Sequence, residues 1–420
     1  MQQGKIELRK SDGPIVFIGS TNAMPMMYAI ELKKLGYDVI YFVDRPSTDL
    51  LNRPENHFPS INYPYPEWII EVNIPSQMMI PFFRKSLLKY LNFKLSKIRT
   101  EKPQLYILNS LFTSLASYIN SNNCKVIALS HGGDLDSWAD VQGADKLSIN
   151  FSKHSFWKFL PSVFSKYMIK LAVKRQYLGY LKSEAVLYFP LGFNKNGDRV
   201  VENIQSSGVR YVPRFDISFE PLIEQPRVYK PESNKMVIFS GVRFTFKNFS
   251  EGNDGYNKGN DEIIKGISLF YKKHKDIEVH FVEKGLDYIE GKRLCKLYGI
   301  ENIVTWHKEM KFIDLLNLYQ KSDVCFDQVG EHWIGAIGAY ALFLGKPLIA
   351  NDTPHVKSGL WPSENPIFTS SNHMDVFKSL ISLQSSIVRF ETHKASKIFA
   401  EKYLGPSKVL HDLFEFESCE

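Results

Sequence analysis

The chain has 420 residues, of which 44% are hydrophobic and 23% are charged. This length exceeds what one ordinary hydrophobic core encloses and predicts two domains of similar size. No run approaches the roughly 18 apolar residues that a membrane-spanning helix needs, so the composition indicates a soluble globular protein. The net charge of +7 is uneven: residues 1–200 carry 25 Lys and Arg against 16 Asp and Glu, a balance of +9, which leaves −2 for the remainder. The basic half is expected to meet an anionic partner.

The cysteines and the N-terminal residues point to a cytoplasmic protein. The apolar run PIVFIGS is short and followed by polar residues, unlike a secretory signal. The four cysteines are scattered without a CxxC pair, which favours a reducing compartment and argues against structural zinc. They are Cys124, Cys295, Cys325 and Cys419.

The first half alternates between strands and helices. Residues 14–20 are typical of a buried strand, Pro25 opens a helix that Gly36 ends, and residues 37–44 form a second strand. This β-α-β unit implies a parallel sheet with right-handed crossovers. The next expected elements are a strand, a helix and three strands, at 104–110, 111–121, 125–134, 184–192 and 210–216.

The second half repeats this alternation after a proline-rich segment of mixed charge. We expect a first domain over residues 1–217, a linker over 218–234 and a second domain over 235–395. Residues 396–420 are expected to form a C-terminal helix that could cross back to the first domain. The predicted fold class is α/β, with two doubly wound Rossmann-like domains that face a cleft. Open α/β sheets bind ligands outside the carboxyl ends of their strands, so the loops there are the candidate sites.

Two cations lie in such a loop of the second domain. Arg243 follows Gly241, where a strand ends, and Lys258 precedes a helix that begins near Asn260. A guanidinium grips oxygens as a fork, an ammonium adds a point charge, and free backbone N–H groups of the helix add more. The pattern favours a diphosphate site. The alternative is a solvated loop with incidental cations.

A second candidate is the glycine-broken stretch over residues 327–347. Gly330, Gly335 and Gly338 would let a ligand approach the backbone, and Trp333 could pack beside a ring. The helix that follows would direct its positive N-terminal end at an anion. The alternative is a tightly packed β-α turn whose glycines serve helix–strand contact.

A third candidate is SHGGDLDSW, residues 130–138. His131 and Asp134 flank a double glycine and could both reach into the cleft. Asp134 and Asp136 also spell D-x-D, a metal–nucleotide motif of another enzyme architecture, but this spacing is common and we expect no metal. The expected acceptor or cleft residues are Ser20, Asn22, Gly132 and Gly133.

Together these motifs resemble the GT-B glycosyltransferases, specifically the retaining glycosyltransferase family 4. Arg243 and the runs KGNDEIIKGI, IVTWHKEM, LLNLYQKSDVCFDQV and HWIGAIGAYALFLGKPLIAND follow the order of that family's donor domain, and HGGD resembles its cleft motif. The resemblance implies that Arg243 and Lys258 hold the donor diphosphate and that His131 touches the donor sugar. The expected catalytic residues are His131, Asp134, Arg243 and Lys258. The expected donor-binding residues are Gly241, Arg243, Lys258, His307, Glu331, His332, Trp333, Gly335 and Tyr340.

The sequence departs from the family at its paired glutamates. The Glu-x7-Glu positions fall on His332 and Tyr340, and Glu331 is one residue out of register. A related branch has DQV followed by an aromatic–glycine pair, here Trp333 and Gly335, and lacks the first glutamate. A tyrosine hydroxyl can bond a ribose without charge. A neutral hydrogen bond contributes about 1 kcal/mol, against about 1.5–3 for a charged one, so affinity should fall by about one to two orders of magnitude at most.

The basic half contains two acid-free amphipathic segments, over residues 78–99 and 146–182. Such segments resemble helices that lie in a membrane interface, and we expect an anionic membrane surface as a partner. The alternative is core helices with solvated cationic faces. No nucleic-acid motif is present, so no nucleic-acid partner is expected.

The expected function is that of a retaining, metal-independent glycosyltransferase of bacterial polysaccharide synthesis. It would move sugar from a UDP- or GDP-sugar, with no cofactor, to a lipid-linked or cell-surface glycan acceptor at the inner face of the cell membrane. The alternative is a non-catalytic GT-B-like partner protein that binds sugar nucleotide or glycan, which Tyr340 favours. A nicotinamide enzyme is rejected, because IGSTNAMP supplies one glycine where a G-x-G-x-x-G is needed.

Overall fold

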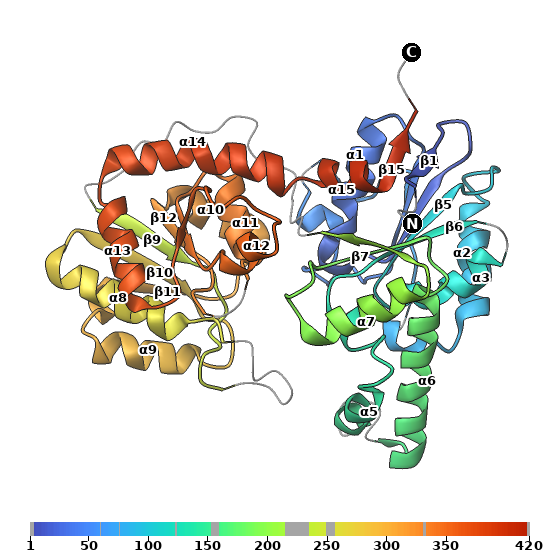
Figure 1. Cartoon of the computed structure of the whole chain (residues 1–420), viewed down its shortest axis with the longest axis horizontal. Helices are drawn as coiled ribbons and strands as arrows, with labels where there is room; N and C mark the ends of the chain where they lie inside the picture. The colour runs from blue at the N-terminus through green and yellow to red at the C-terminus, as the bar shows by residue number, and fades with distance from the viewer. Residues whose placement is uncertain are drawn as a thin grey trace. The chain divides into compact units, whose positions relative to one another are not determined.

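The chain folds into two compact units in the computed structural model (Figure 1). One unit comprises Met1–Phe215 with Pro406–Glu420, and the other comprises Asp216–Gly405. The expected linker over 218–234 lies outside the described residues. The structure describes residues 4–58, 60–74, 76–121, 124–152, 159–214, 235–248, 257–330 and 333–417.

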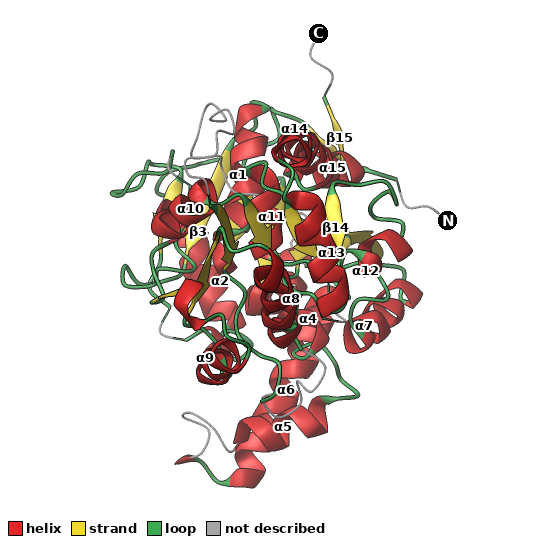
Figure 2. Ribbon diagram, turned by 90° about the vertical axis from the view of Figure 1, so that its left-hand side faces the viewer, coloured by secondary structure: helices red, strands yellow, loops and turns green. Residues whose placement is uncertain are grey.

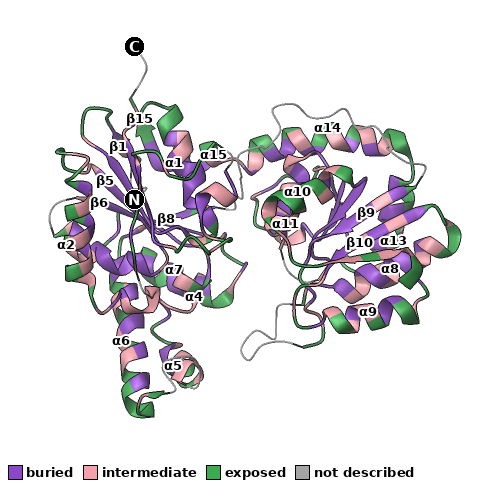
Figure 3. Ribbon diagram, turned by 180° about the vertical axis from the view of Figure 1, so that it is seen from behind, coloured by how far each residue is buried: buried purple, intermediate pink, exposed green. Residues whose placement is uncertain are grey.

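The first unit is built on a seven-stranded parallel sheet in the order β4-β3-β2-β5-β6-β7-β8. Its strands are short apolar runs that are buried along most of their length (Figure 3), as expected of a parallel sheet covered on both faces. The strands are β2 Ile15–Ile18, β3 Val39–Val43, β4 Ile69–Glu71, β5 Leu105–Asn109, β6 Lys125–Leu129, β7 Ala185–Tyr188 and β8 Arg210–Pro213.

Helices cover both faces of this sheet, because alternate residues of a strand point to opposite sides. In β2, Ile15 and Phe17 pack in the core under α1 and α15, whereas Val16 and Ile18 pack in the core under α2 and α3. The helices are α1 Pro25–Lys34, α2 Arg84–Leu95, α3 Ala116–Asn120, α4 Gly133–Asp136, α5 Ala144–Ser152, α6 Ser162–Tyr180, α7 Lys195–Ser206 and α15 Pro406–Leu413.

The second unit has a six-stranded parallel sheet in the order β11-β10-β9-β12-β13-β14. The strands are β9 Met236–Ser240, β10 Ile277–Val282, β11 Val304–His307, β12 Val324–Phe326, β13 Leu348–Ala350 and β14 Ile367–Thr369. The helices are α8 Asn260–Lys273, α9 Tyr288–Leu297, α10 Phe312–Lys321, α11 Ala336–Phe343, α12 Thr353–Lys357, α13 His373–Leu383 and α14 Ser386–Tyr403.

Both units are doubly wound and Rossmann-like, which confirms the predicted fold class. In each sheet the strand order reverses direction once, between β2 and β5 in the first unit and between β9 and β12 in the second. Loops on either side of such a reversal point diverge and leave a crevice at the carboxyl ends of the strands. The loops after β9 and β12 therefore form the candidate ligand site of the second unit.

The C-terminal region differs from the single helix expected over residues 396–420. α14 ends at Tyr403, α15 begins at Pro406, and β15 Phe414–Phe416 pairs in parallel with β1 Ile6–Leu8. The helix breaks because proline cannot donate the backbone hydrogen bond that would continue α14, whereas it suits the first position of a new helix. In the described part of the chain, no helix combines the length and the apolar character needed to cross a membrane.

Candidate functional site

The two ends of the loop from β9 to α8, which carry Arg243 and Lys258, are tied together at the reversal point of the second unit. The backbone N–H of Lys258 donates to the carbonyl of Thr245 over 2.8 Å, and the N–H of Thr245 donates to Oδ1 of Asn260 over 3.1 Å. Gly259 between them has φ +69°, and a Cβ there would lie 2.7 Å from the backbone N of Gly330. The loop after β9, the start of α8 and the loop after β12 thus pack as one cluster.

The ammonium of Lys258 lies within this cluster. Its Nζ donates to Oε1 of the buried Gln328 over 2.7 Å. Burial lowers the pKa of Lys258, the Asp327 carboxylate opposes that shift, and the positive charge of Arg243 adds to it. The two cations are therefore close enough to repel each other. An anion bound between them would relieve that repulsion.

The guanidinium of Arg243 remains open to a ligand. The side chain is exposed and makes no hydrogen bond or ion pair with any residue that the structure describes. Its stem passes over Gly285, where an added Cβ would lie 2.6 Å from Arg243 Cγ and 2.2 Å from the carbonyl oxygen of Phe244. With φ +99° as well, position 285 accepts only glycine without strain. The side chain of Arg243 thus packs against the turn after β10, at Gly285.

Asp327, which the sequence analysis did not single out, organises the turn from β12 into α11. Its carboxylate accepts the backbone N–H groups of Gly335 over 2.6 Å and Gly338 over 2.9 Å. A Cβ at Gly338 would lie 2.7 Å from Asp327 Oδ2. Gly335 and Gly338 thus pack closely against Asp327, a contact that a tightly packed turn would make. The anion at the N-terminus of α11 is Asp327 itself.

Tyr340, at the position of the expected second glutamate, packs into an aromatic cluster. Its ring centroid lies 4.9 Å from that of Phe312 and 6.4 Å from that of Tyr319, both on α10. Burial raises the pKa of Tyr340, so the hydroxyl stays neutral. Glu331 and His332 lie outside the described residues, and Trp333 is half-buried.

His307 and Gly241 are engaged in packing within the second unit. Nε2 of His307, at the end of the edge strand β11, lies 2.9 Å from Nδ1 of His280 on β10. Burial lowers the pKa of both imidazoles, which suits a pair of neutral rings that share one hydrogen. A Cβ at Gly241 would touch the ring of Phe239 and the side chain of Ile337 at 3.3–3.4 Å.

In the first unit, Asp134 holds the loop after β6 in shape. Its Oδ1 accepts the hydroxyl of Ser130 over 2.7 Å and the backbone N–H of His131 over 3.0 Å. Burial raises the pKa of Asp134 to about 6. Asp136 accepts the hydroxyl of Tyr188 and the amide of Asn194, each over 3.1 Å. Both carboxylates of the D-x-D are therefore occupied by protein groups, and the described residues contain no cluster of three or more metal-binding side chains.

Arg214, also missed by the sequence analysis, fixes the hydrogen position on His131. Its Nη2 lies 2.7 Å from Nδ1 of His131, and because a guanidinium can only donate, Nδ1 must accept. The hydrogen of the neutral ring is therefore on Nε2, which is buried without a partner among the described residues. Burial, and then the Arg214 charge, lower the pKa of His131 well below its usual range. His131 can donate one hydrogen bond from Nε2 but is a poor proton donor in acid catalysis.

The remaining expected residues of the first unit shape two loops. The backbone N–H and the hydroxyl of Ser20 donate to Asp44 over 3.1 and 2.9 Å. Asn22 is exposed at φ +53°, a left-handed conformation that asparagine tolerates. Gly132 has φ +126°, which needs glycine, and Gly133 is exposed at the start of α4. Asp44, the carboxylate that a nicotinamide enzyme would use, is thus occupied by Ser20.

Comparison with known proteins identifies the fold. No protein-family model and no curated protein matches the sequence. A glycosyltransferase from Rickettsia africae superposes with a TM-score of 0.57 at 15% identity, over 95% of this chain and 96% of that one. Sucrose-phosphate synthase from Thermosynechococcus elongatus gives 0.53 at 12%, over 95% and 96%. A lipopolysaccharide outer core galactosyltransferase gives 0.51 at 12%, over 96% and 99%. The chain has the GT-B fold.

The GT-B likeness, at such low identity, concerns the fold alone. It covers nearly the whole of both chains, so both Rossmann-like units are included. It agrees with the resemblance predicted from the sequence at the level of GT-B. Membership of glycosyltransferase family 4 stays a prediction.

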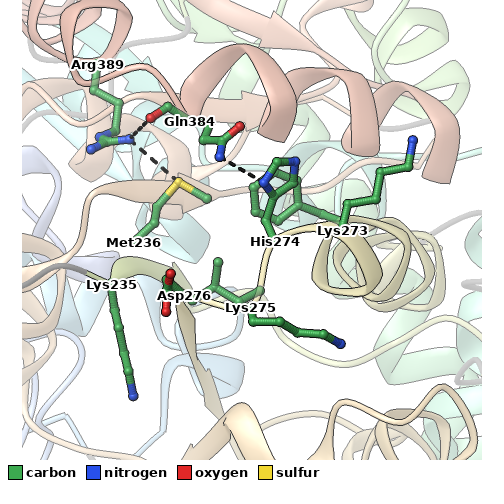
Figure 4. A pocket seen from close by; sticks show the side chains of 10 residues that line it. Lys235, Met236, Lys273, His274, Lys275, Asp276, Gln384 and Arg389 are labelled. Atoms are coloured by element: carbon green, nitrogen blue, oxygen red, sulfur yellow. Dashed lines mark hydrogen bonds between the residues drawn. The ribbon is translucent and has the colours of Figure 1, made fainter.

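A cavity of about 370 Å³ lies in the second unit at the amino ends of β9 and β10 (Figure 4). This edge of the sheet is opposite the carboxyl ends of the strands, where the loop of Arg243 and Lys258 begins. Its polar groups bond to one another: Arg389 Nη1 donates to the carbonyls of Leu383 and Gln384 over 2.6 and 2.9 Å, and Gln384 Nε2 lies 2.8 Å from His274 Nδ1. In Figure 4 the lysines at its rim direct their ammonium groups away from it. The cavity lies at the amino end of β9, whereas Arg243 follows the carboxyl end of the same strand.

Proposed function

We propose that this protein transfers a sugar from a nucleoside diphosphate sugar to an acceptor. The observation that carries the proposal is the pair of cations, Arg243 and Lys258, at the reversal point of the second sheet. One is open to a ligand, and the other is half-buried, with its pKa lowered by burial and further by the charge of Arg243. A diphosphate matches two converging positive charges at this edge of a Rossmann-like sheet.

In the proposed reaction the two cations stabilise the departing diphosphate. As the bond between the sugar and the β-phosphate breaks, negative charge develops on the phosphate oxygens, and fixed donors stabilise that charge. Two protein cations fill the place that a divalent metal would otherwise take, which supports a metal-independent reaction. The donor, a UDP- or GDP-sugar, is a substrate, and no resident cofactor is proposed.

His131 is proposed to position the sugar by hydrogen bonding. Its buried Nε2–H has no partner among the described residues, so a hydroxyl of the donor would satisfy it. Since burial, and then the Arg214 charge, keep the ring neutral, proton transfer would have to involve the leaving diphosphate and the acceptor. This arrangement supports a retaining reaction in which the leaving phosphate accepts the acceptor's proton.

The acceptor is proposed to be a lipid-linked or cell-surface glycan. The first 200 residues carry the excess positive charge of +9, in keeping with an anionic acceptor or surface. We propose accordingly that the protein works in bacterial polysaccharide synthesis, at the inner face of the cell membrane.

A second candidate function is non-catalytic binding of a sugar nucleotide or glycan. It is favoured by Tyr340, whose ring packs against α10 where the family would place a ribose-binding carboxylate. A catalytically inactive protein would bind nucleotide sugars and never consume them. A panel of donors with lipid-linked and glycan acceptors separates the two functions.

The test is donor hydrolysis or transfer with the wild type, Arg243→Ala and Lys258→Met, with Lys272→Ala as the control. Lys272 is an exposed cation on the same helix α8 and lies toward its far end. We expect losses of about 100-fold or more in kcat for each site variant, since removal of one donor to a developing charge has that effect, and no loss for the control. Unchanged turnover by Arg243→Ala would refute the assignment. Binding without turnover across the panel would establish the second function.

A further inference from the structure

α5 and the N-terminal half of α6 form a helical pair that projects from the first unit (Figure 1 and Figure 2). The other half of α6 is anchored: Arg175 Nη1 donates to the carbonyl of Pro81 over 3.0 Å, and Gln176 Nε2 donates to the carbonyl of Ser110 over 2.9 Å. Residues 162–174 continue beyond this anchor for about 20 Å at 1.5 Å per helical residue. α6 packs against α5 and against the segment Ser110–Leu115.

Apolar side chains gather at the end of this helical pair. Val163 and Phe159, at 83% and 77% exposure, are the most exposed large apolar residues that the structure describes. Phe164 and Tyr167 in the first turns of α6 are also exposed, as is Ile149 on α5. A water-soluble domain rarely exposes several large apolar side chains within a short stretch, and a patch of this kind marks an interaction surface. We call these five residues the apolar tip.

Cations flank the apolar tip. Lys166, Lys170 and Lys174 recur every four residues and so form a stripe along α6. Asp145, the last acid before Glu184 in the sequence, forms an ion pair with Lys170. This surface combines exposed apolar groups with a row of lysines and has almost no acidic residue. It matches the interface of an anionic bilayer, where apolar groups enter the acyl boundary and lysines contact headgroups.

The segment over residues 78–99, which was also expected to face a membrane, differs from the apolar tip in its burial. In α2, Leu88, Leu91 and Leu95 are buried in the core of the first unit. The apolar face on which the expectation over residues 78–99 rested thus lies in the core at Leu91 and Leu95 and is exposed at Phe83. A second aromatic residue, Phe93, is also exposed.

We propose that the apolar tip and its lysine stripe form a membrane-docking element for bilayers that contain anionic lipid. The apolar tip enters the interfacial region, and Lys166, Lys170 and Lys174 contact headgroup phosphates. This inference does not rest on the proposed glycosyl transfer, because it concerns binding of a surface by a different part of the first unit.

The test is co-sedimentation of the full chain with vesicles of phosphatidylcholine alone and of phosphatidylcholine with phosphatidylglycerol at about 7:3. We expect the wild type to bind the anionic vesicles, less so as salt rises. The triple variant Val163→Ser/Phe164→Ser/Tyr167→Ser should bind at least about tenfold more weakly. The matched control is Ile387→Ser/Ile398→Ser on α14, which removes two residues of similar exposure and should bind as the wild type does.

A second variant guards against misfolding of the first. Lys166→Gln/Lys174→Gln keeps the apolar tip and changes exposed or half-exposed charges, so the fold should persist. It should bind anionic vesicles several-fold more weakly and show a smaller dependence on salt. Wild-type levels of binding by both variants would overturn the proposal, and so would a wild type that ignores anionic vesicles. A wild-type dimer that the triple variant converts to monomer, without vesicle binding, would assign the apolar tip to a second copy of the chain instead.

Discussion

The contact between Arg214 and His131 joins two residues that are 83 positions apart in the sequence. Because the guanidinium donates to Nδ1, it selects the tautomer with the hydrogen on Nε2 and disfavours a second proton on the ring. A sequence pattern reveals neither effect, since Arg214 is one cation after a short strand. The contact depends on the tertiary structure, which places Arg214, just after β8, next to the loop after β6.

Replacement of Arg214 by Gln should raise the pKa of His131. The variant removes a positive charge 2.7 Å from the imidazole and keeps a short polar side chain that can still donate to Nδ1. The measurement is a pH titration of the His131 ring by NMR in the wild type and in Arg214→Gln, with His131→Gln to assign the signal. An unchanged titration would show that burial alone keeps the ring neutral.

His355 should make the second unit less stable in mild acid. Its ring stacks on Trp361 with centroids 3.9 Å apart, and burial lowers its pKa to about 3. Between pH 3 and the usual value near 6.5, the unfolded chain binds a proton that the folded unit does not. Stability therefore falls as pH falls through this window, by up to about 1.4 kcal/mol per pH unit.

The variant His355→Phe keeps a stacked ring without a titrating group. Urea unfolding at pH 7 and pH 5 should give a smaller loss of the free energy of unfolding for the variant than for the wild type. His274→Phe, which changes a less buried histidine of the same unit, serves as the comparison. Equal losses in the wild type and in His355→Phe would exclude His355 as the source.

At the scale of elements, most strands of both sheets follow from local patterns, whereas β4, β14 and the helices α7, α9 and α13 were not predicted. Buried parallel strands read as continuous apolar runs, and Pro25 and Gly345 mark the limits of helices that the structure contains. The turn from β12 into α11 was predictable only as a glycine-rich loop. Its organising residue, Asp327, bonds to backbone N–H groups 8 and 11 residues further on, and those contacts exist only once the helix is docked.

The short pair β1–β15 gave no usable sequence signal, because each strand has three residues and the partners lie at opposite ends of the chain. It nevertheless completes the first unit. α15 and β15 bury four apolar side chains in the core under α1, each contributing about 1.5–3 kcal/mol when fully buried. They are Val409, Leu410, Leu413 and Phe414.

Truncation after Gly405 should therefore destabilise the first unit by several kcal/mol and leave the second unit folded. Thermal unfolding by calorimetry would show one transition at a lower temperature and one that is unchanged. Truncation after Glu417, which keeps α15 and β15, is the control and should unfold as the full chain does. A first unit that unfolds at the same temperature without α15 and β15 would contradict this account of the core.

At the scale of the whole molecule, the predicted GT-B architecture was confirmed because it depends on many short-range signals that agree with one another. Local features such as the D-x-D and the glycine-broken loop were harder to interpret. Aspartates and glycines occur both in ligand sites and in tight turns. Here the aspartates accept hydrogen bonds from Ser130, from Tyr188 and from the first turn of α11. Arg243 differs from these residues. Its side chain packs against the turn at Gly285 and makes no hydrogen bond or ion pair with the described residues.

The most direct measurement is calorimetric titration of UDP and GDP into the wild type, Arg243→Ala and Lys272→Ala. It requires neither the acceptor nor turnover, so it tests only whether the diphosphate binds at the two cations. We expect one nucleotide to bind the wild type and Lys272→Ala equally, and to bind Arg243→Ala about 10- to 100-fold more weakly, the effect of losing one charge-assisted hydrogen bond. Equal affinity of Arg243→Ala and the wild type, or no binding of either nucleotide to the wild type, would contradict the account.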